Sequence, residues 1–173
     1  MKIQTRIAAM FSIATLAFAT HAATNKPTAS SYLVTHKADV AASAATVYAA
    51  LGQVDKWWDA RHTHSGKSAN LKLEMRAGGC FCEAWDGSSV EHMHVLYALR
   101  DQGLRMEGGI DLLQEKAVTG ILTFTLTPEA GRTHIVLTYR VRAAEAGLDA
   151  SAELVDMVLA DQLKGLVSYL AKK

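Results

Sequence analysis

The feature that most constrains the fold is one long amphipathic helix at the C-terminus. Over residues 149–171 the apolar side chains recur at helical spacing and so share one face of a helix. They are Val155, Leu159, Leu163, Leu166 and Leu170. A helix with one apolar face must bury that face against another layer. The rest of the chain must therefore supply a matching apolar surface.

That surface is predicted to be an antiparallel β-sheet, because much of the remaining sequence alternates between apolar and polar residues. The alternating segments are residues 32–40, 71–75, 80–85, 91–99, 104–107, 121–126 and 135–141. Two short helices are expected after the first strand, at 44–51 and 54–58. A polar loop follows at 59–70, in which His62 and His64 are expected to be solvated.

The predicted fold is an α+β helix-grip fold, in which a curved antiparallel sheet of about six to seven strands wraps around the C-terminal helix. A curved sheet that grips a helix tends to enclose an apolar cavity. With 173 residues, of which 50% are hydrophobic, the chain is large enough to bury one core. We assign one domain to residues 32–173, after a flexible lead-in at 23–31.

Residues 1–22 have the features of a bacterial secretory signal peptide. Lys2 and Arg6 precede an uncharged, mostly apolar run, and small residues follow it. Cleavage is expected after Ala22, which would release a mature protein that begins at Ala23 into the periplasm or the medium. The apolar run is shorter than the ~18–20 residues of a spanning helix, so no stable membrane insertion is expected after cleavage. The alternative is an uncleaved N-terminus that anchors the chain.

The charge balance argues against nucleic acid as a partner. The chain has 18 Lys and Arg against 17 Asp and Glu, a formal net charge of +1. Binding to a phosphate backbone requires a basic surface. The sequence contains no P-loop, dinucleotide fingerprint, Ser-hydrolase or zinc-protease motif, and no cofactor is expected.

Several short motifs resemble the SRPBCC or START-like superfamily, which has the fold of the birch pollen allergen. They are residues 43–51 followed by Trp57-Trp58, residues 76–83 with their Gly-Gly-Cys-Phe core, and Glu91-His92-Met93. Within the superfamily, residues 32–170 resemble the branch homologous to the C-terminal domain of the activator of the Hsp ATPase. The resemblance implies a helix-grip fold whose hydrophobic cavity binds lipids or other apolar small molecules. It does not imply one reaction.

The side chains expected to line such a cavity are large inward-facing residues of the sheet and the Trp pair, with two carboxylates near the mouth. They are Trp57, Trp58, Phe81, Glu83, Glu91, Met93, Met106, Phe124 and Tyr139. Adjacent residues on a helix cannot both face the core, so one of the two Trp is expected to line the cavity. The expected partner is a hydrophobic small molecule or lipid, bound without obligatory catalysis.

The turn at Asp86–Ser88 decides which side chains of its hairpin meet. If these three residues form the loop, Glu83 stands opposite Glu91 on the inner face. Like charge and partial desolvation make one carboxylate of such a pair easier to protonate, which suits acid–base catalysis. In the alternative, both carboxylates reach solvent, anchor a ligand or pair with an arginine such as Arg61 or Arg105. A second candidate function is therefore a cyclase-, dehydratase- or hydrolase-like enzyme that uses Glu83 and Glu91. The resemblance to the activator branch implies a third, a cochaperone-like interaction module.

The outer face of the same hairpin carries two cysteines and two histidines. In the predicted register Cys82 meets His92 and Cys80 meets His94, a donor set that suits zinc or copper. Strand neighbours two positions apart lie about 6.5–7 Å from each other, which is unfavourable for a shared metal ion and for a Cys80–Cys82 disulfide. An oxidising compartment nevertheless favours disulfides. The prediction is two half-buried thiols beside two surface histidines, with no bound metal.

Overall fold

The computed structural model describes residues 28–173, so the predicted signal peptide and most of the predicted lead-in lie outside the described residues. The elements in chain order are β1 (Ser31–Val40), α1 (Ala44–Leu51), η1 (Val54–Lys56), η2 (Ala60–His62), η3 (Ser68–Asn70), β2 (Leu71–Leu73), β3 (Cys80–Trp85), β4 (Ser88–Leu99), β5 (Gly103–Glu107), η4 (Asp111–Leu113), β6 (Val118–Glu129), β7 (Arg132–Ala143), η5 (Asp149–Ser151) and α2 (Ala152–Leu170). In this part of the chain no helix is both long and apolar enough to cross a membrane.

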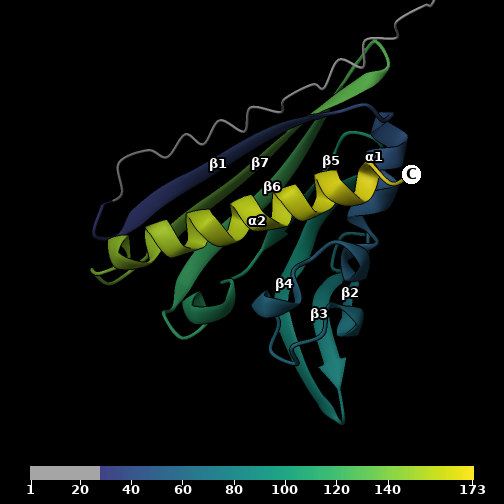
Figure 1. Ribbon diagram of the computed structural model, residues 1–173. Coiled ribbons are helices and arrows are strands. Elements are labelled where there is room, and N and C mark those ends of the chain that lie inside the picture. The colour runs from purple at the N-terminus through teal and green to yellow at the C-terminus, as the bar shows by residue number, and fades with distance from the viewer. Residues whose placement is uncertain (1–27) are drawn as a thin grey trace, which may run out of the picture.

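The architecture is the predicted α+β helix grip. Seven strands form one sheet in the order β1-β7-β6-β5-β4-β3-β2, and each pair of neighbours is antiparallel. Figure 1 shows α2 lying across one face of this sheet. The apolar stripe of α2 and the inward side chains of the sheet form one hydrophobic core, as the helical spacing predicts.

The core leaves little room between α2 and the segment after η1. A Cβ atom at Gly165 would collide with the carbonyl oxygen of Trp57. The aromatic rings beside this contact also pack closely, with ring centroids 5.7 Å apart for Trp57 and Trp58 and 5.0 Å apart for Trp58 and Phe81. Close contact with the backbone therefore explains a glycine in the middle of a long helix.

The prediction that only one of the two Trp faces inward is wrong, because helical geometry ends at Lys56. Trp57 has φ −133°, outside the helical range, and both rings are buried. The indole of Trp57 donates a hydrogen bond to the carbonyl of Ala50 at 2.8 Å, and that of Trp58 donates to the carbonyl of His62 at 3.0 Å. Each ring thus fills the core and satisfies its polar N–H.

The β3–β4 hairpin differs from the prediction by one residue. Its turn has two residues, Asp86 and Gly87, with φ of 44° and 78°, as in a type I′ turn. Glu83 consequently pairs with Val90 instead of Glu91. A shift of one residue moves a side chain to the opposite face, so Glu91 lies on the outer face and is 61% exposed. The predicted Glu83–Glu91 pair is therefore wrong.

A β-bulge restores the predicted register farther along the hairpin. Phe81 pairs with Met93, but the next residue of β3, Cys82, pairs with Glu91, so His92 is an extra residue in β4. His92 and Met93 are consecutive in the sequence, yet both are buried on the inner face. The bulge is what brings a histidine to the core side of the sheet.

Candidate functional site

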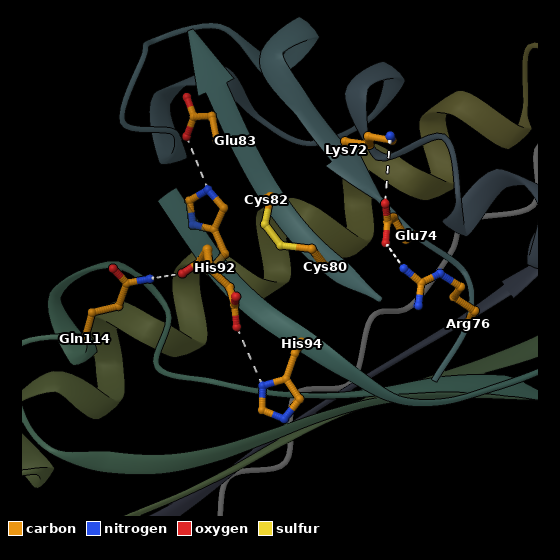
Figure 2. Close-up of a disulfide and its surroundings, with 10 residues drawn as sticks. Lys72, Glu74, Arg76, Cys80, Cys82, Glu83, His92, His94 and Gln114 are labelled. Atoms are coloured by element: carbon orange, nitrogen blue, oxygen red, sulfur yellow. Dashed lines mark hydrogen bonds and ion pairs between the residues drawn. A yellow bond between two sulfur atoms is a disulfide. The ribbon is translucent and has the colours of Figure 1, made fainter. Parts of the chain in front are cut away.

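Glu83 is a carboxylate with 0% exposure on the inner face of β3. Its Oε2 accepts a hydrogen bond from the backbone N–H of His64 at 2.9 Å, and its Oε1 accepts one from the backbone N–H of Ser65 at 2.7 Å. Nε2 of His92 lies 3.2 Å from Oε2. Figure 2 marks this contact with a dashed line. A buried charge needs such partners. Glu83 therefore ties β3, the bulge of β4 and the loop after η2 together.

These hydrogen bonds decide the charge of Glu83. Burial alone raises the pKa of this carboxyl group, but the hydrogen bonds from Ser65, His64 and His92 outweigh burial and leave the pKa below its ordinary value. Glu83 is therefore an anion at neutral pH. The expectation of an easily protonated carboxylate is thus wrong for Glu83.

The loop that contacts Glu83 is also anchored to α2. The backbone N–H of Asp59 donates to Oε1 of Gln162 at 2.9 Å, and Gln162 is buried. The carboxylate of Asp59 accepts a hydrogen bond from the backbone N–H of Arg61 at 2.9 Å and so caps η2. Contacts to α2 on one side and to β3 on the other hold His62 and His64 in defined positions.

A pocket of about 120 Å³ lies between this loop, the β4 bulge, η4 and α2. One wall consists of hydrogen-bonding side chains and the other of aliphatic ones. The residues that line it are Arg61, His62, Thr63, His64, His92, Ile110, Leu112, Leu154, Val155 and Val158. The imidazole rings of His64 and His92 lie 5.7 Å apart, centroid to centroid. The polar wall includes the imidazoles of His62, His64 and His92, whose N–H groups can donate hydrogen bonds.

A possible cation site adjoins the pocket. One donor atom each of Asp59, His62 and Asp161 lies within 4.8 Å of the other two. Nη2 of Arg61, however, lies 2.6 Å from a carboxylate oxygen of Asp59 and 3.4 Å from one of Asp161. The hydrogen bonds from Arg61 lower the pKa of Asp59. A guanidinium already balances these carboxylates, so the cluster supports no metal assignment.

The nine residues predicted to line a ligand cavity do not line this pocket. Most are core side chains that pack against one another; they are Trp57, Trp58, Phe81, Met93, Met106, Phe124 and Tyr139. Glu83 lies behind His92, and Glu91 is on the outer face. The hydroxyl of Tyr139 donates to the carbonyl of Gly108 at 2.8 Å and accepts from the N–H of Ile110 at 3.3 Å, which positions one wall of the pocket.

The four possible metal ligands of the β3–β4 hairpin, Cys80, Cys82, His92 and His94, do not meet at one point. Cys80 and Cys82 form a disulfide with a Cα–Cα distance of 5.4 Å, so the predicted pair of thiols is wrong. The strand is shorter here than an extended one, and the shortening coincides with the register shift between Phe81 and Cys82. His92 lies on the inner face, so only His94, opposite Cys80, shares the face of the sulfur atoms.

No family model matches the chain, and no curated protein is similar to it in sequence. The fold is similar to solved structures of low sequence identity. CalU16 from Micromonospora echinospora matches with a TM-score of 0.60 and 15% identity over 88% of this chain and 86% of that one. The Aha1 dimer from Colwellia psychrerythraea matches with a TM-score of 0.59 and 16% identity over 80% of this chain and 95% of that one. Ara h 8.0201 matches with a TM-score of 0.58 and 12% identity over 83% of this chain and 99% of that one.

These similarities concern the fold. The chain shares its antiparallel sheet and C-terminal helix with these structures, which include an Aha1 protein and an Ara h 8 protein. At 12–16% identity they do not assign the chain to a family. Function must be argued from the site itself.

Proposed function

We propose that the protein is an exported binding protein whose ligand is a small amphipathic anion, such as a carboxylic acid with an apolar tail. The observation that carries this proposal is the two-sided pocket, with three histidines on one wall, beside an Arg61 that is paired with Asp59 and Asp161, and aliphatic side chains on the other. Histidine side chains can donate hydrogen bonds to carboxylate oxygens. The START-like fold supports a ligand-binding role in general terms.

The size of the pocket limits what it can enclose. Its volume of about 120 Å³ is below the ~300–1,000 Å³ of a pocket that buries a whole drug-sized ligand. The head of an amphipathic ligand fits inside, and a longer tail must leave across the rim. Leu154 lies at this rim and is 43% exposed, which gives the tail an apolar surface to cover.

Export and the branch of the superfamily belong to the same proposal. The N-terminal charge and apolar pattern supports a signal peptide, and a disulfide suits the oxidising periplasm or medium. The motif from Arg76 to Glu83 supports the branch homologous to the activator of the Hsp ATPase.

The binding proposal is tested with octanoate, octanol and octylamine, three ligands that share one tail. Calorimetric titration of the mature protein is expected to give the tightest binding for octanoate. Leu154→Asp places a negative charge at the rim and is expected to weaken octanoate binding about tenfold or more, since it removes apolar contact and adds repulsion. Leu99→Asp is the matched control, because Leu99 is similarly exposed at 48% but lies outside the pocket lining. Equal binding of all three ligands would contradict an anion site.

A second function is favoured by the contact between Glu83 and His92. A buried carboxylate that orients an imidazole at a pocket is the arrangement of a general acid–base catalyst. In that case the ligand recovered after incubation with the wild type is chemically altered, and the ligand recovered from His92→Gln is not. Mass spectrometry of the ligand before and after incubation distinguishes the enzyme from the binding protein.

A further inference from the structure

We propose that the Cys80–Cys82 disulfide is a redox-active site that accepts two electrons from a dithiol, such as a pair of neighbouring cysteines in another exported protein. The two cysteines are separated by one residue in the same strand, and both are half-buried. Their sulfur atoms lie on the face of β3 opposite to the buried side chains of Phe81 and Glu83. The bridge is thus outside the core and near solvent.

The position of the bridge makes a stabilising role small. The loss of entropy that a disulfide imposes on the unfolded chain grows with the number of residues in the closed loop. Here the loop spans only residues 80–82, and β3 is already hydrogen-bonded to β2 on one side and β4 on the other. The bridge connects no separate elements, so its chemistry is the better reason for its presence.

The neighbouring strands surround the sulfur atoms with charged and titratable groups. On β4, His94 pairs with Cys80 and Glu91 pairs with Cys82. A carboxylate oxygen of Glu91 lies within 4.8 Å of both sulfur atoms, and Oε1 of this side chain lies 3.7 Å from Nδ1 of His94. Figure 2 labels His94 and the disulfide, which lie on neighbouring strands of the hairpin.

The remaining charged groups form the border of this site. On β2, Lys72 pairs with Cys82, and its ammonium lies 3.9 Å from the carboxylate of Glu74. Arg76 binds Glu74 at 2.7 Å. On β5, Glu107 lies 3.5 Å from Nε2 of His94. Two carboxylates therefore hold the imidazole of His94 beside the disulfide, and Lys72 supplies the positive charge on the other side.

The exchange proceeds in two balanced steps. A thiolate of the dithiol attacks Sγ of Cys82 and forms a mixed disulfide, while the bond between Cys80 and Cys82 breaks and its electron pair remains on Sγ of Cys80. His94, the cross-strand neighbour of Cys80, is placed to give this sulfur a proton. The second thiolate of the dithiol then attacks the dithiol's own sulfur in the mixed disulfide, the bond to Sγ of Cys82 breaks, and its electron pair stays on Sγ of Cys82, which takes a proton from solvent. The dithiol has lost two electrons and two protons, and the two cysteines have gained them.

The first test measures whether the bridge exchanges in the folded protein. Mature protein is equilibrated in glutathione buffers that leave ordinary structural disulfides oxidised, then alkylated and weighed by mass spectrometry. A substantial doubly alkylated fraction is expected, and Cys80→Ser is expected to carry one glutathione on Cys82. The Cys80→Ser/Cys82→Ser double variant is expected to keep the denaturation midpoint of the wild type. A bridge that stays oxidised in these buffers, or a strongly destabilised double variant, makes the disulfide structural and overturns the proposal.

The second test examines His94. In His94→Gln, the rate of reduction by dithiothreitol, compared at equal concentrations of the attacking thiolate, is expected to fall at least about tenfold, because the imidazole that would protonate Sγ of Cys80 is gone. His134→Gln is the matched control, because His134 also contacts a carboxylate, at 2.9 Å from Asp39, but lies on β7. Equal rates for both variants and the wild type at each pH would remove His94 from the mechanism and overturn this part of the proposal.

Discussion

Replacing Glu83 by glutamine is the sharpest test of how the candidate site is held together. The two carboxylate oxygens of Glu83 accept hydrogen bonds from the backbone N–H groups of His64 and Ser65, but a glutamine side chain has only one acceptor oxygen. The amide NH₂ must then face a backbone donor. A lost hydrogen bond to a charged group costs about 1.5–3 kcal/mol, and a buried donor without an acceptor costs about 1–3 kcal/mol. Since these losses overlap, we expect Glu83→Gln to lower the free energy of unfolding by about 2–4 kcal/mol.

The difference in the free energy of unfolding between wild type and Glu83→Gln should depend on pH, which provides an independent check. The folded protein holds the pKa of Glu83 below its ordinary value of 4.5, so the ionised carboxylate stabilises the fold above that pH. This contribution is lost as the pH falls through the lower, folded-state pKa. Glutamine does not titrate. The difference between wild type and Glu83→Gln is therefore expected to be largest at neutral pH and to shrink as the pH falls below about 4.5.

Urea unfolding at several pH values measures both effects, and amide hydrogen exchange at His64 and Ser65 reports the loss of their acceptor. Glu91→Gln is the matched control, because Glu91 is 61% exposed on the outer face of the hairpin and is expected to change stability by less than about 0.5 kcal/mol. If the two variants are equally stable, or if their difference does not depend on pH, the assignment of Glu83 as a buried anchor is refuted.

Three further predictions follow from other contacts. Gly165→Ala is expected to lower the melting temperature, although alanine favours helices by about 1 kcal/mol, because its Cβ meets the carbonyl oxygen of Trp57; a higher melting temperature would contradict this contact. Tyr139→Phe is expected to cost about 1–2 kcal/mol in urea unfolding, since the hydroxyl bonds the backbone of Gly108 and Ile110; no measurable loss would argue against both bonds. The exported protein is expected to begin at Ala23 by intact mass, and a mass that includes residues 1–22 would rule out cleavage there.

The sequence predicts the fold well because its strongest patterns are long. Alternation over the strands and the apolar stripe of α2 specify an antiparallel sheet with a covering helix, and both are confirmed. Asp-Gly between alternating segments is the strongest short signal for a two-residue type I′ turn, so the sequence also contains the information for the β3–β4 turn. A three-residue loop displaces the tip of the hairpin by one residue and gives the wrong partner for Glu83.

The site could not be predicted from the sequence for a different reason. The bulge that turns His92 inward depends on how β3 and β4 fit the neighbouring strands, and no local pattern marks it. The position of His62 and His64 depends on Gln162 and Glu83, which are distant in the sequence. The spacing of a regular strand is unfavourable for the Cys80–Cys82 bridge, but the strand is irregular at that point.

The strand order has a consequence for how the chain folds. Residues Ser31 to Val40 pair with Arg142 to Thr133, which are separated from them by 111 positions at one end (142 − 31) and 93 at the other (133 − 40). Such distant pairing slows folding. At a synthesis rate of ~5–20 residues per second, the first strand waits about 5–20 s for its partner. A nascent chain in this state has an incomplete sheet, which suits a protein that must cross a membrane, as we propose, before it folds.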